Sequence, residues 1–258
     1  MSYKYLLFEA DSGVGEITLN QPEKRNALSL DLLRELGSLF ERIQNEKNIK
    51  VVIVKGAGKV FSSGHDISEM VGGDVNYYNE IFSTCSGVMQ KIQSLPQPFI
   101  AQVHGIATAA GCQLVAACDL AVAAEDALFG TPGVKIGVFC STPAVPLVRA
   151  IGRKRALEML FTGRMISARE AEQYGLVNKV VPAAQLGPET RAMAHEIAQA
   201  SPLTLAIGKS AFYAQVNLSD SQAYNYCNQI MVNNLFAEDA EEGLKAFLEK
   251  RKPVWKGK

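Results

Sequence analysis

The chain has 258 residues, with 26 Lys or Arg and 26 Asp or Glu, so its formal net charge is zero. An apolar content of 48% excludes a disordered chain, and a chain of this length buries roughly three quarters of its unfolded surface without a disulfide or metal. The lack of net positive charge argues against general nucleic-acid binding.

The first third of the chain predicts a hairpin, a helix and a buried strand. Two β-rich runs, Tyr5–Glu9 and Val14–Leu19, flank a turn and predict an antiparallel hairpin. Ser29 is a candidate N-cap for a helix to about Gln44, where apolar residues recur with a 3.6-residue period. The continuous apolar run Val51–Val54 is typical of a strand buried on both faces.

The middle of the chain alternates between helices and strands. The expected elements are a helix over 77–95, a strand over 99–103, a helix over 108–117 and a strand over 120–123. This alternation favours a parallel or mixed α/β core.

The last third predicts consecutive helices. Ser167–Glu170 and Ser219–Gln222 fit capping boxes, and Ser201-Pro202 fits an N-cap followed by proline. We therefore divide the chain into an α/β core over 1–190 and a C-terminal helical region over 191–258.

Three segments rich in small residues could carry chemistry. Residues 61–67 (FSSGHDI) follow a strand, and a helix beginning at about Ile67 would direct free N–H groups at an anion. Residues 104–113 (HGIATAAGCQ) could present a backbone N–H to an oxyanion. Residues 129–143 predict an irregular, shaped loop. Each segment also has a purely structural interpretation, as a tight turn, a close helix–strand contact or a connector.

Other signals are weak. The sequence lacks the G-x-S-x-G, H-E-x-x-H and phosphate-loop motifs, and its three histidines are too scattered for a metal site. Five irregularly spaced cysteines without a C-x-x-C pair predict reduced thiols.

The first residues do not resemble a signal peptide, and no apolar run is long enough to span a bilayer. We expect no membrane association and a cytoplasmic protein, or a mitochondrial matrix protein if the source is eukaryotic and a transit peptide has been removed.

Together, the three segments resemble the crotonase (enoyl-CoA hydratase/isomerase) superfamily. The match covers nearly the whole chain, from QPEKRNAL at 21–28 through SSGHDISEM to EEGLKAFLEKRKP. It is greatest to hydratase-domain-containing members that share the F-C-S-T-P loop. The resemblance implies a spiral of ββα units, a C-terminal helical region used for trimerisation, and acyl-CoA binding without a separate cofactor.

The resemblance also implies an oxyanion hole of two backbone N–H groups that polarise the thioester carbonyl. These belong to His65 in SSGHD and to Ala110 in TAAGC, where the family usually has glycine. Because the donor is the main chain, alanine need not remove it. The residues implied to contact CoA are Lys24, Asn26, Ala27, Ser63, Gly64, His65, Asp66, Ile67 and Ala110.

The chain departs from the family at both catalytic glutamates of the hydratases. Gln113 replaces the first, in GCQL, and Gly133 replaces the second, in PGVKIG. Glutamine is not an ordinary general base, and glycine has no side chain to offer. Each lost acid or base group is worth roughly 10²–10⁴ in rate, so conventional two-glutamate hydration is not expected.

Two other groups could act instead. Cys140 lies about where some relatives place a catalytic aspartate or tyrosine, although a buried structural thiol is the alternative. The His65 side chain could serve a decarboxylase-like reaction or form a wall of the CoA pocket. We expect a structural hydrogen bond from His104, a surface position for His195, and solvated roles for Glu69, Asp74 and Glu80.

The sequence therefore predicts an acyl-CoA enzyme of the hydratase/isomerase family, a lyase by name, that stabilises a thioester enolate. The alternatives are a decarboxylase-like enzyme that uses His65 and a non-catalytic acyl-CoA binding protein. We expect a homotrimer or a dimer of trimers, with no nucleic-acid partner and no metal.

Overall fold

A six-stranded sheet forms the base of the molecule in the computed structural model, which describes residues 3–258. The strand order is β1-β2-β3-β4-β6-β9, and all neighbours are parallel except the β1–β2 hairpin. The predicted hairpin is thus confirmed. The strands are β1 (Leu6–Asp11), β2 (Val14–Leu19), β3 (Val51–Gly56), β4 (Phe99–Val103), β6 (Leu120–Ala124) and β9 (Lys179–Val181).

A second, three-stranded sheet has the order β5-β7-β8. Its strands are β5 (Ile106–Thr108), β7 (Leu128–Gly130) and β8 (Met165–Ser167). The chain passes from β4 to β5 and from β6 to β7, moving between the two sheets in each unit, which produces a spiral. A helix begins soon after β5, and helical segments also follow β7. Because β5 and β7 are neighbours in the small sheet, these connections lie close together.

Helices cover both faces of the large sheet. The helices α1 (Leu30–Gln44), α2 (Val75–Ser94) and α3 (Ala110–Ala117) share one apolar core with it, and α7 (Leu186–Ala198) forms a second core on the opposite face. Strand β3 shows the reason, because Val52 and Val54 belong to the first core while Val51 and Ile53 belong to the second. The prediction of a strand buried on both faces is confirmed.

The predicted caps are present. The hydroxyl of Ser29 accepts a hydrogen bond from the Leu32 N–H, and the periodic apolar residues of α1 are buried. Ser167 and Glu170 form a capping box at α6 (Ala168–Tyr174), which follows α4 (Ser141–Ile151) and α5 (Arg153–Thr162). Ser201 caps α8 (Pro202–Gln215), and the second capping box begins α9 (Asp220–Leu235).

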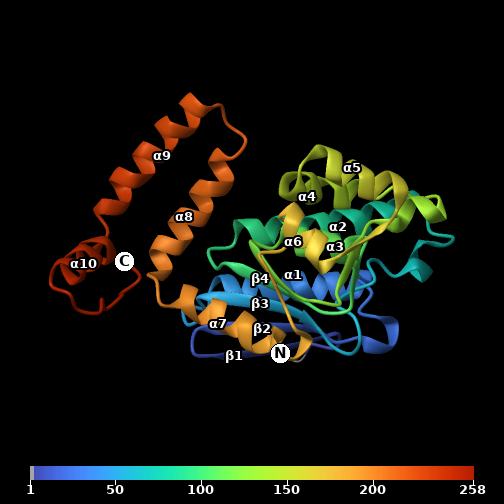
Figure 1. The fold of residues 1–258 in the computed structure, drawn as a ribbon, viewed down its shortest axis with the longest axis horizontal. Helices are drawn as coiled ribbons and strands as arrows, with labels where there is room; N and C mark the ends of the chain where they lie inside the picture. Colours follow the sequence, from blue (N-terminus) through green and yellow to red (C-terminus); the bar gives the residue numbers. More distant parts are fainter. Residues whose placement is uncertain (1–2) are drawn as a thin grey trace.

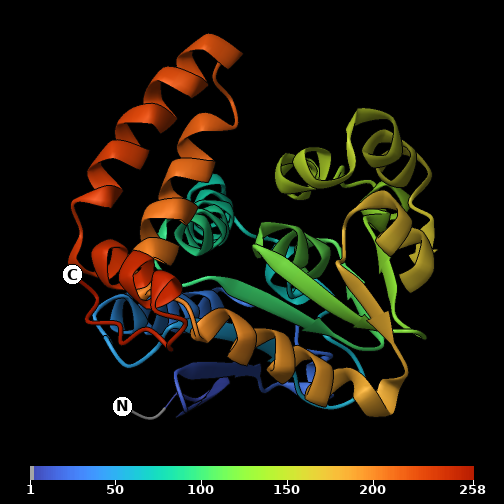
Figure 2. The same ribbon diagram turned by 60° about the vertical axis from the view of Figure 1, so that its left-hand side comes forward.

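The C-terminal helices α8, α9 and α10 (Glu238–Leu248) extend away from the two sheets (Figure 1). Figure 2 shows α8 beside α2, with α9 running back along α8. The division of the chain at residue 190 stays a prediction, and it falls inside α7, which packs on the sheet. Within residues 3–258, no helix is long and apolar enough to cross a membrane.

Some element boundaries differ from the predictions. Asp74 accepts a hydrogen bond from the Tyr77 N–H at 2.8 Å, so α2 begins at Val75 and not at residue 77. Residues 106–108 pair as β5, so the next helix begins at Ala110 rather than at residue 108. The remaining short elements are the 3-10 helices η1 (Pro22–Lys24), η2 (Ile67–Met70), η3 (Pro132–Ile136) and η4 (Ala183–Gln185).

Candidate active site

The segment around His65 is fixed between two other parts of the chain. On one side, the Leu28 N–H donates to the Gly64 carbonyl at 2.7 Å. On the other side, Ser62 pairs with β5, and the Thr108 hydroxyl donates to the Ser63 carbonyl at 3.0 Å. These bonds hold the backbone on both sides of His65 and leave no acceptor for the His65 N–H among residues 3–258.

The start of α3 lies against this segment. Gly64 has φ +91°, and a Cβ atom there would lie 2.9 Å from the Thr108 carbonyl oxygen and 3.2 Å from the Ala110 nitrogen. Ala109 has a left-handed φ of 48°, which is strained for a residue with a Cβ. Its own N–H donates to the Gly130 carbonyl at 2.9 Å, whereas the Ala110 N–H at the helix start has no acceptor in the described chain.

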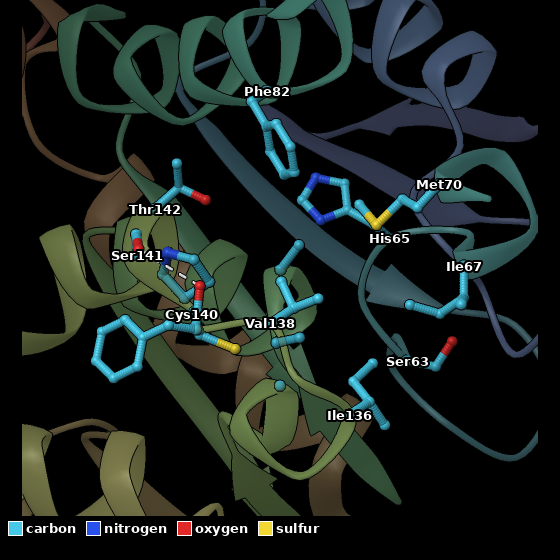
Figure 3. Close-up of a pocket in the computed structure, with 15 residues that line it drawn as sticks. Ser63, His65, Ile67, Met70, Phe82, Ile136, Val138, Cys140, Ser141 and Thr142 are labelled. Atoms are coloured by element: carbon cyan, nitrogen blue, oxygen red, sulfur yellow. Dashed lines mark hydrogen bonds between the residues drawn. The ribbon is translucent and has the colours of Figure 1, made fainter. Parts of the chain in front are cut away.

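A cavity of about 330 Å³ lies in front of these two amides. Of the predicted site residues, it brings together Ser63, His65, Ile67, Ala110, Gly133 and Cys140. Figure 3 shows the His65 ring and the Cys140 side chain facing the cavity from different walls. No charged side chain lines it, and most of the lining is apolar.

Several of the residues that line this cavity were not predicted from the sequence. They are Met70 from η2, Phe82 from α2, Ala109 before α3, and Ile136, Val138, Phe139, Thr142 and Pro143 from the third segment. The irregular composition of residues 129–143 indicated this loop as a whole. Nothing in the sequence marks Phe82, because only the packing of α2 brings it to the cavity.

His65 is neutral at physiological pH. Burial lowers the pKa of its imidazole to about 4 from an ordinary value of 6.5. The ring packs edge-on against Phe82, with the ring centroids 5.4 Å apart, and its Nε2 atom is buried without a hydrogen-bond partner. The side chain can therefore bind to a ligand as a neutral group, but it is not a cationic acid.

Cys140 and Gly133 are in direct contact. Burial raises the pKa of the Cys140 thiol, although the Gly133 N–H opposes that shift. A Cβ atom on Gly133 would lie 2.3 Å from the Val138 carbonyl oxygen and 2.7 Å from the Cys140 sulfur. The loop before α4 thus occupies the space into which a side chain at position 133 would extend.

Gln113 does not line this cavity. It lies on α3, is 3% exposed, and lines a neighbouring cavity together with residues of α2 and α4. Its Oε1 atom has no partner within residues 3–258. The position that the sequence assigns to the first glutamate is therefore next to the site and not in its wall.

The residues implied to contact CoA take different positions. Lys24 and Asp66 form an ion pair of 2.9 Å near the start of η2, and the Ser68 hydroxyl and Lys24 lower the pKa of Asp66. The Asn26 side chain is fully buried, where its Oδ1 accepts from Gln21 and its Nδ2 donates to the carbonyls of Ala57 and Val60. Asn26 shapes the turn and its side chain does not reach the cavity. Lys24, Ala27, Gly64 and Asp66 also lie outside the lining.

The segment after His65 does not form an anion site, the interpretation that stood as the alternative to a tight turn. Residues 67–70 form only the short helix η2, and the Asp66 carboxylate accepts from the Ser68 N–H at 3.0 Å. One N–H group at the start of this segment, that of Ser68, is therefore bonded to the protein's own carboxylate, and the Glu69 N–H donates to the Asp66 carbonyl.

The remaining candidates have structural positions. The His104 imidazole hydrogen-bonds to the Gly58 carbonyl at 3.0 Å, as predicted, and His195 is exposed. Glu69 accepts from the Leu30 N–H at the start of α1, Asp74 caps α2, and Glu80 pairs with Arg34. Across the described residues 3–258, no group of three His, Cys, Asp or Glu side chains could hold a metal ion.

The spiral of two sheets and the paired amides define a protein of the crotonase class. The family model for enoyl-CoA hydratase/isomerase matches residues 9–258, and the chain belongs to this family. It is 51% identical over 246 residues to the human enoyl-CoA hydratase domain-containing protein 3, mitochondrial, covering 94% of this chain and 80% of the relative.

Solved structures of related proteins have the same fold as this chain. A crystal structure of that human protein has a TM-score of 0.95 and 49% identity, covering 98% of this chain and all of the other. An enoyl-CoA hydratase from Mycobacterium smegmatis also has a TM-score of 0.95, with 45% identity over 98% of this chain and 99% of the other. These matches confirm the predicted superfamily and the predicted α/β fold.

Proposed function

We propose that this protein is an acyl-CoA enzyme that holds a thioester carbonyl between the N–H groups of His65 and Ala110. The observation that carries the proposal is that both amides lack an acceptor within residues 3–258 and that both residues line one cavity. Preorganised N–H donors stabilise the negative charge that develops on a carbonyl oxygen when an enolate forms. The solved hydratase structure supports the family context.

Two-glutamate hydration does not fit the cavity. Its lining contains no carboxylate, His65 is neutral, and the Cys140 thiol is protonated at pH 7. A reaction that needs enolate stabilisation but no strong base fits better. No cofactor is proposed besides the CoA that is part of the substrate.

Decarboxylation of a malonyl-type CoA is the second candidate, because the uncharged lining favours it. The bond from the α carbon to the carboxylate breaks, its electron pair forms the enolate, CO₂ leaves, and water supplies the proton to the α carbon. The neutral His65 ring could hydrogen-bond to the substrate during this step, but its low pKa does not support a role as acid.

The test is to incubate the purified protein with a panel of enoyl-CoA and malonyl-type CoA substrates. We expect turnover of at least one of them. Hydration of crotonyl-CoA should be slower by about 10² or more than that of a relative with both glutamates. Tight binding of acyl-CoA with no turnover of any substrate would overturn the proposal and favour a non-catalytic binding protein.

The name of the human relative includes the mitochondrion. We propose the mitochondrial matrix as the location if the source is eukaryotic and the cytoplasm otherwise.

A further inference from the structure

A second cavity, of about 340 Å³, lies beside the candidate active site. It is formed by α2, α3, α4 and the segment that follows α8. Thr142 lines both cavities, and Val145, Pro146 and Arg149 continue the wall of the second one along α4. The two cavities therefore share part of their wall at Thr142.

The two cavities differ in charge. The first cavity has no charged side chain in its lining. The second cavity is lined by the guanidinium of Arg149 and by no carboxylate. The only hydrogen bond from the Arg149 side chain goes to the Val145 carbonyl, at 2.7 Å, and within residues 3–258 the guanidinium forms no ion pair. Its positive charge is therefore left for a ligand or solvent to balance.

The other polar groups in the second cavity are neutral hydrogen-bonding groups. They are Ser86, Gln90, Gln93, Gln113, Thr142 and Asn217. Gln113 is 97% buried, yet its Oε1 atom has no partner in the described chain. A buried amide without a partner is unfavourable against a hydrocarbon chain, so the cavity suits a polar group and its water better than the methyl end of a fatty acyl chain.

We propose that this cavity selects acyl-CoA substrates whose acyl chain ends in a carboxylate, which Arg149 binds. The inference rests on the proposed function, because it requires the thioester to lie at His65 and Ala110. Thr142 and Arg149 are seven residues apart on α4, which is about 10 Å along the helix axis. The acyl chain must also cross the first cavity before it reaches Thr142, so a chain of about twelve carbons, with C–C bonds of about 1.5 Å, is needed to reach Arg149.

The test compares three saturated ligands by calorimetry: lauroyl-CoA, dodecanedioyl-CoA and the methyl ester of dodecanedioyl-CoA. Dodecanedioyl-CoA carries the terminal carboxylate and the methyl ester masks it at nearly the same length. A charge-assisted hydrogen bond to arginine is among the stronger ones. We expect dodecanedioyl-CoA to bind about tenfold more tightly than the other two, and Arg149→Gln to reduce this preference to about one while the lauroyl-CoA affinity is kept.

Arg153→Gln is the matched control, because Arg153 is exposed at the start of α5 and does not line the cavity. It should keep the preference. Equal or weaker binding of dodecanedioyl-CoA by the unaltered protein overturns the proposal, as does a preference that survives Arg149→Gln. The ester comparison decides the matter even if Arg149→Gln does not fold. If none of the three ligands binds, the proposed function fails as well; if all bind equally, only this inference fails.

Discussion

His65 couples the stability of the protein to pH. Its pKa is about 4 in the folded protein, against an ordinary value of 6.5. As the pH falls from 6.5 to 4, the unfolded chain binds a proton that the folded protein does not, so the free energy of unfolding decreases across this window. More than about one unit above pH 6.5 the side chain is neutral in both states and has no such effect. The shift corresponds to about 3 kcal/mol.

We predict that His65→Phe removes this part of the pH dependence. Urea unfolding at several pH values between 4 and 7 should show a smaller loss of stability for the variant than for the unaltered protein. His195→Gln is the control, since His195 is exposed on α7. Identical pH profiles for His65→Phe and the unaltered protein would show that the ring is not desolvated.

Position 133 lacks a carboxylate and also lacks the space for a side chain. The Val138 carbonyl and the Cys140 sulfur occupy the place of a side chain, so Gly133→Ala should destabilise the protein by about 1–3 kcal/mol. Gln113→Glu with Gly133→Glu should not restore hydration of crotonyl-CoA, because the loop must move before a glutamate fits. Gly187→Ala is the control for Gly133→Ala, since nothing lies within 4 Å of a Cβ added at Gly187. Hydration that rises in the double variant would contradict this interpretation.

These two positions show what the sequence could and could not predict. The absence of both glutamates is visible in Gln113 and Gly133 from the sequence alone. Their surroundings are not visible in the sequence. Gln113 lines a second cavity, and the Val138 carbonyl occupies the space beside Gly133 where a side chain would lie. Such contacts depend on how distant segments pack, and no local pattern encodes them.

Among the elements, α8 is attached to the core by a buried cluster of polar side chains. Lys209 donates to Asp119 at 2.6 Å and to the carbonyls of Ile92 and Gln97, and Tyr213 donates to Asp119 at 2.8 Å. Burial lowers the pKa of Lys209 although Asp119 opposes the shift. This cluster joins α8 to α2 and to the residues just before β4 and β6.

We predict that Lys209→Met lowers the free energy of unfolding by about 3–5 kcal/mol, because it leaves the Asp119 charge without its partner. Chemical denaturation would measure the loss. Lys154→Met, at an exposed position on α5, should change stability by less than about 0.5 kcal/mol. Equal effects of the two substitutions would show that the cluster does not anchor α8.

The elements themselves were largely predictable. Period and capping residues predicted α1, α6, α8 and α9, because those signals are local. A helix begins at Ile67 as predicted, but it is only the short 3-10 helix η2, and the Asp66 side chain accepts from its Ser68 N–H. The prediction missed that residues 106–108 form a strand, since their partner β7 lies about 20 residues away in sequence.

The C-terminal helices give the molecule a large exposed apolar surface. Phe236 is 86% exposed and Phe247 82%, and surfaces of this kind mark protein–protein contacts. We predict a homotrimer or a dimer of trimers, so sedimentation should give a mass three or six times the 27.9 kDa of one chain. Phe236→Asp with Phe247→Asp should favour the monomer. A monomeric unaltered protein would contradict the prediction.

The spiral brings together two backbone N–H groups from segments about 45 residues apart, and their action on a thioester is the central claim. Difference infrared spectroscopy of bound crotonyl-CoA carrying ¹³C at its carbonyl measures that action directly. If His65 and Ala110 donate to the carbonyl oxygen, its stretching frequency should be lower in the complex than in water. A frequency equal to or above that in water would contradict the oxyanion hole.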